Sequence, residues 1–171
     1  MKLPLVGLMI FLLTSFTLPP AFCQPKIAVL AFELKDLTLL PRIPEEIKRT
    51  ASIKPMLEEE LVKSGFQVVQ IPTQAQLKAT SGLGYLFDHH DMAAQLAKQY
   101  DADYVVVGRL HKPSFLFIYL MAHLVDVNTG RLLADYLSEV KGAEKKLTRK
   151  GVESLADKIN ESFKNLKKAP D

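Results

Sequence analysis

Residues 102–135 read ADYVVVGRLHKPSFLFIYLMAHLVDVNTGRLLAD, and this stretch decides the fold class. Apolar residues on both faces predict a buried strand over residues 104–111, a turn at 112–114 and a long mid-sheet strand over residues 115–127. The Asn-Thr-Gly sequence at 128–130 is typical of a hairpin, because Gly130 can adopt a positive φ, and it leads into a third strand. The stretch therefore predicts a meander of three strands, and it contains no recognisable catalytic constellation.

The rest of the chain alternates between strand and helix patterns. Ser52 and Asp88 are suitable N-caps, Lys141 and Gly142 are expected to end the third meander strand, and residues 35–44 and 80–87 read as a loop and a flexible connector. The expected order, β-α-β-α-β-β-β-α, predicts the α/β class, with a single mixed β-sheet and helices packed on it. Outside the meander, the expected elements are strands over residues 26–34 and 66–71, a short helix over 73–79, and helices over about 52–64, 89–99 and 148–167.

The last helix has two distinct faces. One carries an apolar stripe at three- and four-residue spacing, which we expect to pack on the sheet: Val152, Leu155, Ile159 and Phe163. The other carries Lys150, Lys158, Lys164 and Lys167. Such a face is commonly only solvated, and the alternative is a surface that contacts anionic membrane or an acidic partner.

The amino terminus has the pattern of a secretory signal over residues 1–23. Lys2 precedes an apolar run over residues 5–18, two prolines follow, and small residues flank a cleavage position before Gln24. We therefore expect a periplasmic protein with one α/β domain over residues 24–171. Two alternatives place the protein on a membrane. The signal could stay uncleaved, although its apolar run is shorter than the ~20 residues that span a bilayer. Cys23 could be lipidated, although lipoprotein signals favour a small residue before the cysteine and Phe22 is bulky.

Charge and cysteine content bear on the partner and on what stabilises the domain. The formal net charge is +3, and it becomes nearly balanced once Lys2 is removed, so nothing indicates a nucleic-acid partner. The single cysteine, Cys23, lies in the expected signal, so the domain is expected to fold without a disulfide and to depend on its apolar core.

The meander also carries a resemblance to known families. Ala102-Asp103-Tyr104, and a two-faced strand ending in the Asp126-to-Gly130 turn, are similar to the closing half of CsgG-like and TolB amino-terminal-like periplasmic domains. The chain resembles still more closely a family of small exported bacterial proteins of unknown function, through His111-Lys112-Pro113-Ser114 before the long strand and Gly142 before the last helix. The resemblance implies work in the cell envelope without catalysis, such as in secretion channels, lipoprotein activators of wall synthesis or outer-membrane adaptors.

Candidate chemistry is sparse. His89 and His90, where some members of the resembled family carry cysteines, are the nearest candidates for metal ligands, but adjacent helical side chains point about 100° apart. His111 and His123 lie on neighbouring strands but far apart in hairpin register. No Gly-x-Ser-x-Gly elbow or phosphate loop is present in the sequence. We therefore expect no metal, no cofactor and no enzymatic activity, with an unknown hydrolase as the remaining enzymatic alternative.

Two functions follow as hypotheses. The first is a non-catalytic periplasmic binding or adaptor module, which docks on another envelope protein during envelope assembly or within an exported complex. The second is a small-molecule carrier, or an accessory protein for an exported dehydrogenase. Its ligand would lie against residues 80–87 and the apolar loop that carries Leu37, Leu39 and Leu40.

Overall fold

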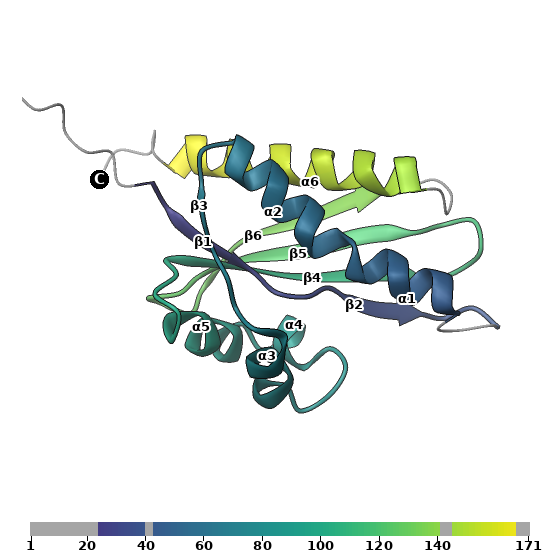
Figure 1. Cartoon of the computed structure of the whole chain (residues 1–171), viewed down its shortest axis with the longest axis horizontal. Helices are drawn as coiled ribbons and strands as arrows, with labels where there is room; N and C mark the ends of the chain where they lie inside the picture. The colour runs from purple at the N-terminus through teal and green to yellow at the C-terminus, as the bar shows by residue number, and fades with distance from the viewer. Residues whose placement is uncertain (1–23, 40–42, 141–144, 167–171) are drawn as a thin grey trace, which may run out of the picture.

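A computed structural model describes residues 24–39, 43–140 and 145–166 of the chain (Figure 1). The expected signal at 1–23 lies outside the described residues, as do Leu40, Lys141, Gly142 and Lys167. Within the described residues, all strands join one mixed sheet, and helices cover it, which confirms the predicted α/β class. No helix of this part of the chain has both the length and the apolar character needed to cross a bilayer.

The sheet is parallel on one side and antiparallel on the other. In sheet order the strands are β3 (Gln67–Val69), β1 (Lys26–Val29), β4 (Tyr104–Lys112), β5 (Tyr119–Asp126) and β6 (Leu132–Glu139), with β2 (Glu33–Asp36) beside β4. The predicted meander is confirmed, because β4, β5 and β6 pair antiparallel, and Gly130 adopts a φ of +68° in the turn between the last two. The parallel part consists of β1 paired with β3 and β4, and of β2 paired with β4.

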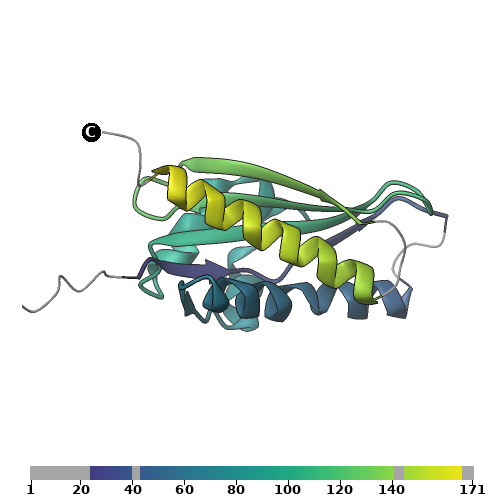
Figure 2. The same ribbon diagram turned by 90° about the horizontal axis from the view of Figure 1, so that it is seen from above.

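Helices lie on both faces of the sheet, so the molecule has three layers (Figures 1 and 2). One face carries α1 (Pro44–Ala51), α2 (Ile53–Lys63) and α6 (Lys145–Leu166), and the opposite face carries α3 (Thr73–Ala79), α4 (Tyr85–Asp88) and α5 (His90–Lys98).

The first predicted strand is broken in the structure. Residues 26–34 were expected to form one strand, but β1 ends at Val29 and β2 begins at Glu33. Between them, the side-chain amide of Gln76 accepts from the Ala31 amide at 2.8 Å and donates to the Ala31 carbonyl at 3.0 Å. These bonds satisfy the Ala31 backbone without a partner strand. Phe32 then packs on Gly108 of β4, where an added Cβ would lie 2.2 Å from the ring.

The helices expected from about residues 52 and 89 begin at Ile53 and His90, but both predicted N-caps are wrong. Ser52 does not cap α2, because its hydroxyl donates to the Arg49 carbonyl at 2.7 Å and its backbone is helical, so it joins α2 to an unpredicted α1. Asp88 does not cap α5, because it ends α4, and its carboxylate lies 3.9 Å from the Arg109 guanidinium. The expected connector over residues 80–87 therefore contains most of a short helix.

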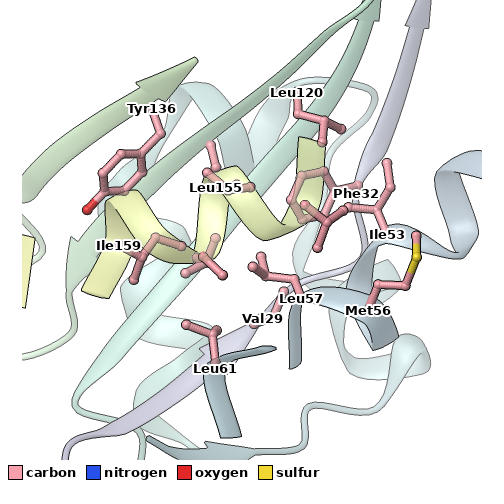
Figure 3. Close-up of a cluster of buried hydrophobic side chains, with 14 of the residues drawn as sticks. Val29, Phe32, Ile53, Met56, Leu57, Leu61, Leu120, Tyr136, Leu155 and Ile159 are labelled. Carbon is pink, nitrogen blue, oxygen red and sulfur yellow. The ribbon is translucent and has the colours of Figure 1, made fainter. Parts of the chain in front are cut away.

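The core has one part on each face of the sheet. On the face of α2 and α6, the predicted stripe of the last helix is confirmed, because Val152, Leu155, Ile159 and Phe163 are all buried. Figure 3 shows Leu155 and Ile159 of this stripe within the apolar cluster. Leu120 and Leu124 of β5 are fully buried beneath them. The opposite part packs α4 and α5 on the sheet and includes Leu86, Phe87 and Leu96. The sheet is thus fixed on both sides, while the ends of its strands remain available for contacts.

Candidate docking surfaces and a histidine pair

One end of the molecule carries exposed apolar side chains from two segments, which we call the apolar tip: Leu37, Leu39, Phe115, Leu116 and Phe117. The first two residues follow β2 and the other three follow β4, and these strands end side by side (Figures 1 and 2). Leu39 is 91% exposed and Leu116 is 78% exposed. The predicted strand over residues 115–127 is therefore wrong at its start, because β5 begins only at Tyr119.

Local hydrogen bonds fix the tip. The Leu37 amide donates to the Lys112 carbonyl at 2.9 Å, which keeps the two segments together. The Ser114 hydroxyl accepts from the amides of Leu116 and Phe117, both at 3.3 Å, which closes the second segment into a turn. The apolar side chains are thus presented on an ordered backbone.

A buried group of charged residues lies directly below the tip. The Lys112 ammonium is 3.0 Å from Glu46 and 3.7 Å from Asp36, and the second oxygen of Glu46 lies 3.4 Å from Arg49. Arg49 also donates to the Thr148 hydroxyl at 2.8 Å. Burial lowers the pKa of Arg49, and the charge of Glu46 opposes that change. These contacts join β2, α1, β4 and α6 beneath the tip.

The outer face of α6 is mixed in charge. Lys150, Lys158 and Lys164 are exposed, as the sequence indicated, and Lys167 lies outside the described residues. Lys158 also donates to the Leu137 carbonyl at the edge of β6. The same helix exposes three acidic residues, which reduce its net positive charge: Glu153, Asp157 and Glu161.

A groove of about 340 Å³ opens beside β2. Its lining is almost wholly apolar and comes from the β1–β2 segment, from α1 and from the connector: Ala31, Phe32, Leu34, Ile47, Thr50, Ala51 and Leu83. The connector thus contributes Leu83 to a concave surface, as the carrier hypothesis requires, whereas Leu37 and Leu39 do not line it.

The four histidines have different surroundings. The His89 ring stacks on Tyr85, with the ring centroids 4.4 Å apart, and its Nδ1 lies 2.9 Å from the Tyr85 carbonyl oxygen. Nε2 of His90 lies 2.9 Å from Nδ1 of His123 on β5. His111 is several residues away from His123 in the β4–β5 register.

The pair of His90 and His123 is a contact that sequence reasoning missed. The His123 ring packs on Phe87 at 3.9 Å between centroids, its Nδ1 is 3.2 Å from the Phe87 carbonyl oxygen, and its Nε2 is 3.6 Å from Asp135. Burial and the charge of His90 lower the pKa of His123, and Asp135 opposes this. No group of three or more His, Cys, Asp or Glu side chains suited to a metal gathers in the described residues.

Arg109 orders the neighbouring connector. Its guanidinium lies 3.5 Å from Glu33 and covers the Phe87 ring at 4.1 Å. Glu33 in turn accepts from the Gly84 amide at 2.8 Å, where a φ of +88° favours glycine. These contacts place α4 against the sheet and so fix Phe87 beside the histidine pair.

Solved structures share this fold at low sequence identity. The PelC dodecamer from Paraburkholderia phytofirmans has a TM-score of 0.53 and 16% identity, over 81% of this chain and 86% of that chain. Lipoprotein GNA1162 from Neisseria meningitidis has a TM-score of 0.51 and 14% identity, over 78% and 95%. TolB from Acinetobacter baumannii has a TM-score of 0.50 and 19% identity, over 82% of this chain and 28% of that chain.

The expected resemblance to TolB is therefore confirmed at the level of the fold. The expected resemblance to CsgG-like domains stays a prediction. No curated protein matches the sequence significantly. Residues 25–159 match the profile of the family DUF3280, which is described as "Protein of unknown function (DUF2380)", so the chain belongs to that family.

Proposed function

We propose that this protein is a non-catalytic adaptor of the cell envelope, which docks on another envelope protein through the apolar tip. The observation that carries the proposal is the tip itself, where five large apolar side chains are exposed above a buried group of ion pairs. Exposed apolar clusters of this kind are typical of interaction sites, and aromatic anchors dominate the energy of many interfaces. The matching partner surface is an apolar groove.

Two further observations support work in the envelope. The pattern of residues 1–23 is that of a secretory signal, which would deliver a domain over residues 24–171 to the periplasm. The fold is also that of GNA1162, whose name describes a lipoprotein, and of PelC, which is a dodecamer in its solved structure. A lipoprotein and a multi-subunit assembly are both compatible with the proposed role, which is docking on another envelope protein.

The test is site-specific photocrosslinking in cells. A photoreactive residue at Leu116, on the tip, is expected to form a discrete product with an envelope protein. The matched control is Leu137, a leucine on β6 that is 53% exposed but lies outside the tip. Replacing Phe115 and Phe117 with serine should abolish the Leu116 product without changing the melting temperature. The proposal fails if Leu116 and Leu137 give the same products, or if the serine variant crosslinks like wild type.

The groove beside β2 supports a second candidate, the small-molecule carrier. Its volume of about 340 Å³ suits a small apolar ligand, because ligand sites commonly occupy ~300–1,000 Å³. Native mass spectrometry of protein from periplasm would then show a bound mass, which Leu83→Asp should remove. A bare wild-type mass would contradict the carrier role and leave the adaptor role standing.

A further inference from the structure

His90 on α5 and His123 on β5 share a hydrogen bond between their imidazole rings. Nε2 of His90 lies 2.9 Å from Nδ1 of His123, and the Phe87 carbonyl oxygen of α4 lies 3.2 Å from the same Nδ1. We propose that this contact is an acid-sensitive latch, which holds α4 and α5 on the sheet at neutral pH and releases them when both imidazoles carry a charge.

The number of protons on the two rings decides whether the contact can exist. In a neutral pair, one of the facing nitrogens donates its proton and the other accepts it. A pair with one charged ring keeps the bond, because the charged ring donates and the neutral ring accepts. When both rings are charged, each facing nitrogen carries a proton, so no lone pair accepts and two positive charges lie side by side. The contact therefore survives the first protonation and is lost at the second.

The charged groups that face the pair come from three further elements. Asp135 on β6 lies 3.6 Å from Nε2 of His123 and offsets one positive charge. Arg109 on β4 covers the neighbouring Phe87 ring at 4.1 Å and carries a fixed positive charge, which Asp88 of α4 balances only partly from 3.9 Å. One charge on the pair thus has a counter-charge, whereas a second adds to the repulsion from Arg109.

The burial of His123 strengthens the effect. Only 13% of its side chain is exposed. This burial, and then the charge of His90, lowers the pKa of His123, and the charge of Arg109 acts in the same direction, whereas Asp135 opposes it. The latched state therefore resists the second proton, and a released state, in which both rings meet water, takes it up more readily.

Release of the contact affects a whole segment, because α4 and α5 are short. They contain four and nine residues. Helices of this length are not stable in water by themselves and depend on packing against the rest of the protein. Leu83, directly before this segment, also lines the groove beside β2. Acid would therefore loosen both the segment and one wall of that groove.

The test is hydrogen–deuterium exchange of the untagged full chain, read by mass spectrometry at about pH 7.5 and about pH 5, on either side of the ordinary imidazole pKa of about 6.5. Protection factors, corrected for the chemical exchange rate at each pH, report opening of the segment. Because opening lets the pair take up a further proton, the open population rises up to about tenfold for each pH unit. In wild type, protection over residues 85–98 should fall by about tenfold or more. At about pH 5 it should lie below that of residues 152–163 in α6, which marks local opening.

Three variants separate a latch from a structural contact. His90→Gln and His123→Gln each remove one titrating ring and keep an amide that can hydrogen-bond, so each should limit the fall over residues 85–98 to less than about threefold. A purely structural role would instead lower protection equally at both pH values. His89→Gln is the matched control, because His89 stacks on Tyr85, and it should behave like wild type. His111 is present in every variant, so its own titration cancels from the comparison.

Circular dichroism checks that each variant is folded. Because the His123 ring packs on Phe87, His123→Gln is the variant at greater risk, and His90→Gln then decides the outcome. The proposal is overturned if wild type keeps its protection over residues 85–98 at about pH 5, if that segment is then as protected as residues 152–163, or if His90→Gln shows the full wild-type fall. None of these results bears on the docking role of the tip, so the two proposals fail independently.

Discussion

Replacing Leu124 with alanine tests the core on which both proposals depend. Leu124 lies on β5, opposite Val106 of β4 and Ala134 of β6, and it is fully buried in the cluster that α6 covers. The change removes three buried carbons, which costs about 2.4 kcal/mol at roughly 0.8 kcal/mol each. The cavity left behind adds to this, so the total loss should lie within about 2–5 kcal/mol.

Urea unfolding measures that loss. The free energy of unfolding decreases by ~2 kcal/mol per molar urea in proteins of this size, so the urea midpoint should fall by about 1–2.5 M while this dependence on urea stays unchanged. Leu137→Ala on neighbouring β6 is the control, because Leu137 is 53% exposed and its replacement should lower the free energy of unfolding much less. Equal shifts in the two variants, or no shift in Leu124→Ala, would show that Leu124 is not buried beneath α6.

Three further perturbations test other parts of the structure. Gly108→Val should lower the free energy of unfolding by about 1–3 kcal/mol, and with it the calorimetric melting temperature, because an added Cβ would lie 2.2 Å from the Phe32 ring. An unchanged melting temperature would show that the ring does not pack on Gly108. Reversing the charges of Lys158 and Lys164 should change the free energy of unfolding by only about ±0.5 kcal/mol, but it should weaken binding to anionic vesicles, which should also fall as salt rises. If wild type and the double variant bind vesicles equally at low salt, α6 is not a membrane-binding surface. Burial lowers the pKa of His123 below its ordinary 6.5, so the unfolded chain binds more protons and stability should fall as pH drops through that value. His123→Gln should reduce this pH dependence of the urea midpoint without abolishing it, since the pKa of His111 is lowered in the same way.

The meander and the last helix could be predicted because their signals are local. The Asn-Thr-Gly turn fixes the hairpin between β5 and β6, and Gly130 adopts the positive φ that its position requires. The stripe of α6 repeats over several turns, so its buried face follows from helical geometry alone.

The helix α1 could not be predicted from its apolar pattern. Its one large apolar side chain, Ile47, is 51% exposed, whereas its buried residues are Glu46, Arg49 and Thr50. Burial of such groups depends on charged partners, and the partner of Glu46 outside α1 is Lys112, which is distant in sequence. A rule that searches for apolar stripes therefore finds no helix here.

The histidine pair was missed for a related reason. His90 begins a helix on one face of the sheet, and His123 lies within a strand. Their contact depends on how α5 packs against β5, which no spacing within the sequence specifies. The sequence could only exclude the wrong pair, His89 with His90, from the geometry of one helix.

Apolar sequence alone also does not separate a buried strand from an exposed tip. Phe115, Leu116 and Phe117 are as apolar as Ile118, yet they are exposed and Ile118 is buried. The difference lies in the residues before them, because Pro113 cannot donate to a strand ladder, and Ser114 accepts the two amides that a strand would otherwise use. The backbone is thus satisfied without a partner strand, while the side chains remain in water. Exposure of these side chains to water is unfavourable, and burial in an apolar groove on a second protein would remove that exposure. The same turn at Pro113 and Ser114 that makes the strand prediction wrong therefore supports the docking role.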